Sequence, residues 1–544
     1  MAQTETRDQQ TRRIARSTAV VMVSFAVAKA ISLLQTVVIA NAFGLGSEWD
    51  AYVAANRIPE LIFTLISGGA LATAFLPVFS GMLAEGKRDD AWRTASHVIN
   101  FIFSVTLVVS AIVFVFAPQL VSSVVAPGFD AETQVQTVEL MRLLLVSTLI
   151  FSVSGIVMGI LQSHNHFFLP ALAPIMFDVG ILFGVIVLLG PFGVNGIAMG
   201  AVLGAAMHLV IQVPGLIHFK ARWSPSLGLR DPQLWRIIRL MIPRIGGLGV
   251  FSLNFLVMNN IASRLGTGSV AALDWGWRLM QIPQTLIGTA MGVVVFPTLA
   301  AFSELGNLDG KRSAMSGAVR FILIGTIPAS VALVVSGQPL ISLLERGAFD
   351  SSASALVYST LVCFSLGLIV HSVLEVVARS FYADKDTFTP FVAALVGATI
   401  NLVGSFALSG VLSIDPTVEG SDRGFVGGLA LANSLGVMAE VGILVFILRR
   451  RWAGIEGDAL ARTLVRVTIA SLVMGVVIFA FNAAWDALGL PGGLLWTIVQ
   501  VAANAAIGTA VFVGMAIILR IRELRVLVDV VLRRREAAVE ALAP

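Results

Sequence analysis

Long runs of hydrophobic residues, broken by short polar segments, follow one another along the whole chain. Stretches such as 467–485 and 494–519 are nearly free of charge and long enough, at about 20 residues per crossing, to span a bilayer as helices. The strands of a membrane β-barrel would instead alternate hydrophobic and polar residues. The pattern therefore predicts an all-α polytopic membrane protein.

The hydrophobic windows between polar breaks predict about fourteen transmembrane helices. Lysine and arginine gather in every second connecting loop, so the positive-inside rule places these loops and both chain ends in the cytoplasm. The approximate limits of the spans are 15–42, 51–83, 95–117, 138–162, 167–190, 194–219, 236–263, 271–302, 314–336, 353–382, 388–412, 425–448, 465–485 and 494–519.

The composition agrees with this class, because 57% of the residues are hydrophobic and 12% are charged, against about 25% charged residues in soluble domains. No basic run interleaved with aromatic residues occurs, so nucleic acid is not an expected partner. Cys363 is the only cysteine, which excludes an internal disulfide and a site made of several thiolates. His164 and His166 lie in a short polar turn, which favours a solvated loop over a metal ligand. No cofactor is expected.

Sequence landmarks recur at a spacing of 220 or 221 residues. Phe75-Leu-Pro77 resembles Phe296-Pro297, and Gly128-Phe-Asp130 resembles Ala348-Phe-Asp350. The spacing predicts two pseudosymmetric six-helix lobes, an N-lobe over 1–225 and a C-lobe over 226–452. Segment 453–544 would add two helices and a basic amphipathic tail on the cytoplasmic membrane surface. Parallel repeats of this kind predict a substrate cavity between the lobes near the membrane midplane.

A few charged residues interrupt the hydrophobic spans, where each costs roughly 2.5–3.5 kcal/mol on insertion scales and usually marks a functional site. Arg57 and Arg278 are 221 residues apart and therefore occupy equivalent positions in the two repeats, as do Glu60 and Gln281. Two facing guanidinium groups would form a bidentate clamp suited to phosphate. Lys29 could add a third positive charge. An anionic substrate is therefore predicted.

The alternative is that each arginine only neutralises an acid of its own helix, Arg57 with Glu60 and Arg278 with Asp274, at helical spacing.

Other polar residues within the spans have less specific interpretations. Asp178 is a candidate proton or cation coupling group, or a carboxylate that hydrogen-bonds to a neighbouring helix. Asn254 is a candidate cavity residue, although asparagines of membrane helices more often form interhelical hydrogen bonds. Glu375 and Arg379 are further candidates for gating or coupling.

Several segments, distributed over both repeats, carry a resemblance to a known family. They are Ala42-Phe-Gly-Leu-Gly46, Asp50-Ala-Tyr52, Arg57-Ile-Pro59, Gly68-Gly-Ala-Leu-Ala-Thr-Ala-Phe75-Leu-Pro77, Arg278-Leu-Met-Gln-Ile-Pro283, Glu345-Arg-Gly-Ala-Phe349 and Phe381-Tyr-Ala-Asp-Lys-Asp-Thr-Phe-Thr-Pro390. In these motifs the chain resembles the MurJ (MviN) family of lipid II flippases, within the larger group of multidrug, oligosaccharidyl-lipid and polysaccharide exporters.

The resemblance implies fourteen helices, a V-shaped cavity between the lobes, and a groove from the last two helices for a polyprenyl tail. It also implies a location in the bacterial inner membrane. Lys29 and Arg278 match cationic cavity positions of the family, and Asp50 matches an aspartate at the outer end, which makes it a candidate for gating or coupling. The Arg-Asp pair that members often carry later in the first helix is Gln35-Thr36 here.

The leading hypothesis is therefore a lipid II flippase that works by alternating access, is not an enzyme, and has lipid II and membrane lipids as partners. Other proteins of cell-wall synthesis are possible partners as well. One alternative is an exporter of another polyprenyl-linked glycan or of a drug. Another is a membrane-embedded polyprenyl-phosphate enzyme, which would normally need clustered carboxylates. The only adjacent acidic pair, Asp89-Asp90, lies among basic residues of a polar loop and reads as a solvated charge run.

Overall fold

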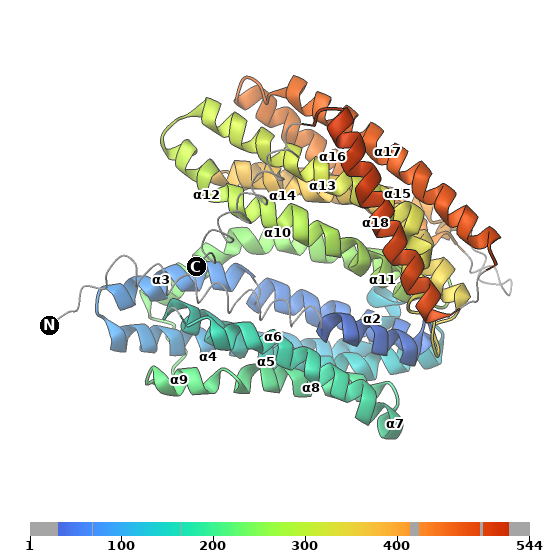
Figure 1. Cartoon of the computed structure of the whole chain (residues 1–544). Helices are drawn as coiled ribbons and strands as arrows, with labels where there is room; N and C mark the ends of the chain where they lie inside the picture. Colours follow the sequence, from blue (N-terminus) through green and yellow to red (C-terminus); the bar gives the residue numbers. More distant parts are fainter. Residues whose placement is uncertain (1–30, 68, 165, 414–423, 490–492, 522–544) are drawn as a thin grey trace, which may run out of the picture. The chain divides into compact units, whose positions relative to one another are not determined.

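The computed structural model describes residues 31–67, 69–164, 166–413, 424–489 and 493–521, and all regular structure within them is helical (Figure 1). Among these residues, twelve helices are long and hydrophobic enough to cross a membrane, and two shorter hydrophobic helices cover Ile31–Phe43 and Ala74–Ala84. The prediction of an all-α polytopic membrane protein is confirmed. The count of fourteen spans stays a prediction.

The chain divides into two compact units. Unit 1 comprises the chain up to Ala271 together with Arg346–Phe349, and unit 2 comprises Ala272–Glu345 and the chain from Asp350 onward. The elements of unit 1 are α2 (Ser47–Ile62), η1 (Phe63–Ser67), α3 (Gly69–Ala84), α4 (Arg88–Leu120), η2 (Val121–Val125), α5 (Ala131–Ser163), α6 (Phe168–Phe183), η3 (Gly184–Leu188), α7 (Leu189–Phe192), α8 (Asn195–Val210), α9 (Val213–His218) and α10 (Pro232–Ala262).

Helix α11 (Ser269–Pro283) runs across the boundary into unit 2. The later elements are η4 (Gln284–Thr289), α12 (Ala290–Glu304), α13 (Leu308–Ser342), α14 (Ser351–Ala383), α15 (Phe388–Leu408), η5 (Val411–Ser413), α16 (Val426–Arg451), α17 (Gly457–Ala487) and α18 (Leu494–Ile518). Elements η1 to η4 are π-helical turns, and η5 is a 3₁₀ turn.

The sequence repeat is visible in the order and the ends of these elements. The π-helical turns η1 and η4 begin at residues 63 and 284, and helices α5 and α14 begin at 131 and 351, so the offset of 220 or 221 is kept. Asp130 and Asp350 precede α5 and α14, and each carboxylate accepts a hydrogen bond from the backbone N–H three residues later. The offset of the sequence repeat is therefore also found in these element boundaries, whereas the division into lobes over 1–225 and 226–452 stays a prediction.

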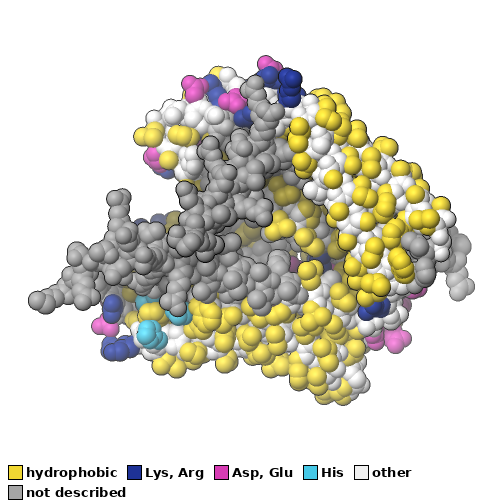
Figure 2. Space-filling view, in the orientation of Figure 1, with side chains coloured by type: hydrophobic (Ala, Val, Ile, Leu, Met, Phe, Trp, Pro, Cys, Tyr) yellow, Lys and Arg dark blue, Asp and Glu magenta, His cyan; other side chains and the backbone are white. Residues whose placement is uncertain are grey.

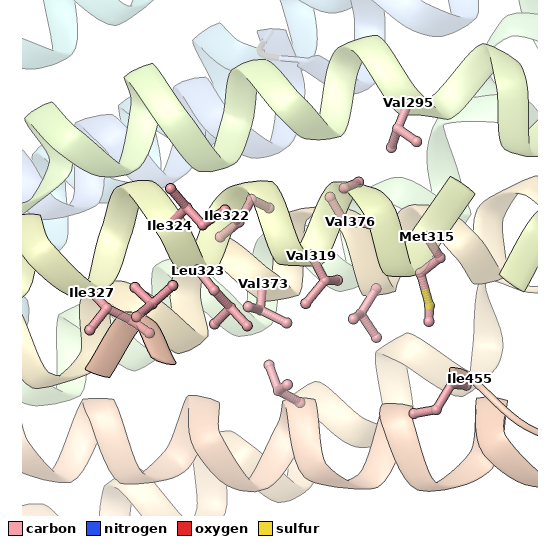
Figure 3. Close-up of a cluster of buried hydrophobic side chains, with 14 of the residues drawn as sticks. Val295, Met315, Val319, Ile322, Leu323, Ile324, Ile327, Val373, Val376 and Ile455 are labelled. Carbon is pink, nitrogen blue, oxygen red and sulfur yellow. The ribbon is translucent and has the colours of Figure 1, made fainter. Parts of the chain in front are cut away.

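Figure 3 shows part of the hydrophobic core of unit 2, to which Ile322 and Ile327 of α13, Val295 of α12 and Val373 of α14 all contribute side chains. Much of the outer surface is also hydrophobic, as the side chains of α17 and α18 show in Figure 2. Lipid tails are as apolar as these side chains, so close packing rather than removal from water holds such helices together.

Glycine residues bring α6 and the turn η3 that continues it into direct contact with α8 in unit 1. A Cβ atom on Gly180 would lie 2.2 Å from the Cα atom of Gly204, and one on Gly200 would lie 2.6 Å from the Cα atom of Gly184. Small residues at such positions let two backbones approach closely, which is a common way to join membrane helices. The α6–α8 contact therefore depends on the absence of these side chains.

Substitution of Gly200 by alanine tests this contact. Alanine favours a helix by about 1 kcal/mol over glycine, yet here its methyl group would push the α6 backbone away. We expect the apparent unfolding temperature to fall by about 2–5 °C. The matched control is Gly442→Ala in α16, where a Cβ atom meets no neighbour within 4 Å. Equal unfolding temperatures for the two variants would contradict the close-packing account.

A buried ionic network joins three interhelical connections of unit 2. The side chains of Lys311 and Asp384 are 6% and 16% exposed and form an ion pair. Asp384 also accepts hydrogen bonds from Ser303 at 2.6 Å and from the Trp452 indole at 3.3 Å. Burial opposes the charge of Asp384, but the hydrogen bonds from Lys311 and Ser303 outweigh it and hold the pKa of Asp384 below its usual value.

A change of Lys311 to methionine would leave the Asp384 charge partly buried without its cation, so we expect a lower unfolding temperature at pH 7. Since the pKa of Asp384 is lowered in the folded protein, the pair stabilises the fold above a pH of about 4 and loses this effect as the pH falls further. The difference in unfolding temperature between the parent and Lys311→Met should therefore be smaller in acid. Thermal unfolding at pH 7 and at a pH below about 4 would measure it. Lys385→Met removes an exposed pair with Glu304 and should change the unfolding temperature little. An equal decrease in this control would contradict a special stabilising role of the buried Lys311–Asp384 pair.

Candidate functional site

Arg57 lies on α2 of unit 1 and its side chain is 12% exposed. Its guanidinium group contacts Asn259 of α10 at 3.5 Å and Glu60 at 3.6 Å, and it lies 5.9 Å from the centre of the Phe255 ring. Asn259 is held in turn by a 2.9 Å hydrogen bond to the carbonyl oxygen of Val125. These two polar contacts are long for hydrogen bonds.

Arg278 lies on α11, at the position of the second repeat that is equivalent to Arg57. The part of this helix from Ala272 onward belongs to unit 2. Its Nε atom donates to the Asp274 carboxylate at 2.5 Å; the arginine side chain is 58% exposed and the aspartate side chain 6%. Gln281 lies one turn further on and is half-buried. The two intrahelical pairs that the sequence offers as an alternative are thus both present. The arginine clamp itself remains a prediction, because each arginine is described within its own unit.

The remaining predicted site residues lie at separate places. Asn254 of α10 and Asp178 of α6 are half-buried, and both have interaction partners. Glu375 and Arg379 form an ion pair on α14, and the Thr289 hydroxyl donates to Glu375 at 3.2 Å, which joins η4 to α14. Lys29 lies outside the described residues. The roles of these residues in binding, gating or coupling stay predictions.

Asp50 is 1% exposed and connects the start of α2 to the start of α11. Its carboxylate accepts hydrogen bonds from the backbone N–H groups of Gly268 at 2.5 Å and Ala271 at 2.7 Å. The first N–H groups of a helix have no partner within the helix, and a carboxylate there also interacts favourably with the helix dipole. Asp50 therefore caps α11 from a helix more than 200 residues away in the sequence.

Four turns of unit 1 contact one another in two matching pairs. A Cβ atom on Gly44 would lie 2.0 Å from the carbonyl oxygen of Ala348, whose N–H donates to the carbonyl oxygen of Asn41 at 3.0 Å. A Cβ atom on Gly128 would lie 2.5 Å from the carbonyl oxygen of Ser263, whose hydroxyl accepts the Gly128 N–H at 3.2 Å. Ala348 is the repeat equivalent of Gly128, so one kind of contact occurs twice. Gly128 stands in a repeated motif and Gly44 in a motif of the family resemblance, but no spacing rule predicts their partners.

A polar cluster on the C-terminal helices was also missed. Asn482 of α17 donates to the carbonyl oxygen of Val335 in α13 at 3.3 Å, and it accepts hydrogen bonds from Gln500 at 3.2 Å and Asn504 at 2.9 Å, both on α18. Interhelical hydrogen bonds of this kind join membrane helices. The cluster therefore fastens the two additional helices to the second repeat.

Comparison with known proteins adds the family. Residues 39–500 match the family model described as "Lipid II flippase MurJ". The chain belongs to the MurJ family. The family resemblance expected from the sequence motifs is thereby confirmed.

A protein of Rhizobium tropici named "Probable lipid II flippase MurJ" is 30% identical over 518 residues, which cover 93% of each chain. The "Lipid II flippase MurJ" of Burkholderia cenocepacia is 27% identical over 500 residues, or 89% of this chain and 93% of the relative.

Solved structures show the same fold. The structure of a "Lipid II flippase MurJ, inward closed conformation" superposes with a TM-score of 0.74 at 23% sequence identity, over 92% of this chain and 98% of that chain. An inward-facing multidrug resistance MATE family transporter of the MOP superfamily superposes with a TM-score of 0.64 at 16% identity, over 81% and 99% of the two chains. At these identities the likeness shows the fold alone, which this chain shares with a solved MurJ structure and with a MATE family transporter.

Replacement of Asp50 by alanine tests the cap of α11. The two N–H groups of Gly268 and Ala271 would lose their acceptors, at a cost of about 1 kcal/mol for a lost helix cap. We expect the amides of 268–271 to exchange with deuterium about fivefold faster, as hydrogen-exchange mass spectrometry would measure. Glu48→Ala, two residues away and exposed, should leave this exchange unchanged. Unaltered exchange in Asp50→Ala would show that the cap is dispensable.

Proposed function

We propose that this protein is a lipid II flippase, which carries the undecaprenyl-diphosphate-linked precursor from the inner to the outer leaflet of the bacterial inner membrane by alternating access. The observation that carries the proposal is membership of the MurJ family over residues 39–500. Two arginines at equivalent positions of the repeat, inside hydrophobic helices, supply the chemistry that a diphosphate requires. This is transport, in which no bond of the substrate is broken.

The substrate's diphosphate would bind to Arg57 and Arg278, with Lys29 as a third cation. A guanidinium group stays charged and presents parallel N–H donors that match phosphate oxygens. In the absence of substrate, Glu60 and Asp274 offset these charges. The diphosphate would bind to the free N–H donors of each guanidinium group beside these local pairs, so that the buried Asp274 keeps its cation in both states. Gln281 and Asn254 would contribute hydrogen bonds to the head group.

The change between inward- and outward-open states would involve residues that join separate helices. Asp50 holds the start of α11, so its release would free this helix to move. Glu375 with Arg379, and Asp178, are the proposed coupling groups, because an intramembrane ionisable residue responds to protons, cations and the membrane potential. Both chain ends would lie in the cytoplasm, where other proteins of cell-wall synthesis could bind.

The fold of the MATE transporters favours a second candidate, the export of a drug or of another lipid-linked glycan. A flippase for a different polyprenyl diphosphate would use the same arginines, so it would differ from a lipid II flippase only in the head group that it binds. A drug exporter would not depend on them in this way. The transport experiment below separates these functions.

The test follows lipid II translocation in cells that are depleted of their own flippase and express this chain or its variants. The parent should restore translocation. Arg57→Ala and Arg278→Ala should each reduce it about tenfold or more, because each removes charge-assisted hydrogen bonds to phosphate. Arg142→Ala is the matched control, since this arginine of α5 donates to the carbonyl oxygen of Phe114 at 3.1 Å and is outside the proposed site.

The amount of each variant in the membrane would be compared by immunoblot. Full translocation by both alanine variants would disprove the role of the arginines. Failure of the parent to restore translocation would count against the flippase assignment itself.

A further inference from the structure

Unit 1 contains a cavity of about 740 Å³ that lies outside the proposed substrate site. Its walls are the end of α3, the first turns of α4, the connection 226–231 and the first turns of α10. Ligand sites typically measure roughly 300–1,000 Å³, so the cavity has the size of a small-molecule site. Figure 2 shows charged and histidine side chains gathered at the end of this unit where α9 ends, next to otherwise hydrophobic helices.

Four cationic and three acidic side chains line the cavity, and each acid already has a partner within it. The pairs are Lys87 with Glu85 at 2.7 Å, Arg93 with Asp90 at 2.5 Å, and His97 with Asp231 at 2.8 Å. Arg230 and Arg236 also line the cavity, and neither forms an ion pair with any other residue in the described part of unit 1. Among the described residues, these two guanidinium groups thus have no carboxylate partner of their own.

The surrounding structure holds these arginines in place. Asp231 accepts hydrogen bonds from the Gln233 N–H at 2.8 Å and from Thr94 at 3.2 Å, and thereby caps α10 between the two arginines. Gly228 has a φ of +61°, and a Cβ atom there would lie 2.1 Å from the His97 ring. Asn100 of α4 donates to the carbonyl oxygens of Ser224 and Ser226, at 2.7 and 2.8 Å. The connection that carries Arg230 is therefore fixed on α4 before any ligand arrives.

The cavity wall also contains a buried oxygen atom that has no hydrogen-bond donor among the described residues. The side-chain carbonyl oxygen of Gln233 is buried and accepts no hydrogen bond from the described residues. A buried acceptor without a donor costs roughly 1–3 kcal/mol, which a ligand hydroxyl group could recover once the Gln233 side chain turns its oxygen toward the cavity. The site thus offers cationic donors for an anion and an acceptor for a hydroxyl group.

From these groups we infer that the cavity binds a phosphate ester of a polyol, with the phosphate on Arg230 and Arg236 and a hydroxyl group on Gln233. Guanidinium groups bind phosphate with paired N–H donors, a role that suits two arginines that line one cavity and have no acid partner among the described residues. Trp223 and Trp235, 66% and 46% exposed, belong to the same end of the unit, and tryptophan is typical of the membrane interface. Both a phosphoglycerol lipid head group and a soluble glycerol phosphate present this chemistry. The inference does not depend on the flippase function.

The test uses the full-length protein in phosphatidylcholine nanodiscs. Calorimetric titration with glycerol 3-phosphate, and with inorganic phosphate for comparison, measures the soluble source. Native mass spectrometry of protein from nanodiscs that also contain phosphatidylglycerol measures retention of the lipid source. We expect saturable binding of at least one glycerol phosphate probe, weakened about tenfold or more in Arg230→Gln/Arg236→Gln.

The control is Arg222→Gln/Arg239→Gln, which removes the same charge from the same connection and helix at residues that do not line the cavity. It should bind within about twofold of the parent. Gln233→Leu should abolish the preference for glycerol 3-phosphate over inorganic phosphate. The single variants Arg230→Gln and Arg236→Gln replace the double variant if its unfolding temperature falls.

Binding of the soluble probe identifies a metabolite site, and binding of phosphatidylglycerol alone identifies a lipid head-group site; either supports the inference. Absence of binding to both probes would overturn it. An equal loss in the control pair would also overturn it, because the effect would then be one of net charge.

Discussion

The hydrocarbon core of a bilayer cannot solvate a charge, and this constraint governs where polar groups occur in the protein. Arg278 with Asp274, Arg57 with Glu60 and Asn259, and Glu375 with Arg379 each place a charge beside a polar partner on the same or a neighbouring helix. A charged side chain within the bilayer costs free energy, so its presence in a hydrophobic helix indicates a functional role. In a flippase, the same cationic groups that require partners at rest are those that can receive a diphosphate.

The absence of a hydrophobic driving force between membrane helices explains how the scaffold is held together. Backbone contacts at Gly180 and Gly200 join α6 to α8, and hydrogen bonds of Asn482 join α17 and α18 to the second repeat. Polar contacts then fix the ends of the helices, where Asp50 caps α11 and Lys311 pairs with Asp384. Rigid helices with defined connections at their ends are suited to moving as bodies, which alternating access requires.

Much of the fold could be predicted from sequence, because a span of about 20 hydrophobic residues and a fixed repeat offset are local, countable features. They located the helices and the equivalence of Arg57 and Arg278. The structure added what depends on three-dimensional proximity. Nothing in the local sequence of Asp50 indicates that it caps a helix beginning at Ser269, and no spacing rule identifies Asn482 as the centre of a cluster. The basic cavity could not be predicted either, because nothing in the sequence around Arg230 and Arg236 indicates that the end of α3 and the start of α4 lie beside them.

The most direct measurement of the central claim uses the purified protein in liposomes with fluorescent lipid II. Reduction of the dye by an impermeant reagent reports which leaflet holds the label. The account predicts that label in the protected leaflet becomes accessible over time in liposomes that contain the protein, at a rate above that of protein-free liposomes. It also predicts that an excess of unlabelled lipid II slows the transfer, whereas an equal amount of phosphatidylcholine does not. A rate equal to that of protein-free liposomes would contradict the assignment of this MurJ family member as a flippase.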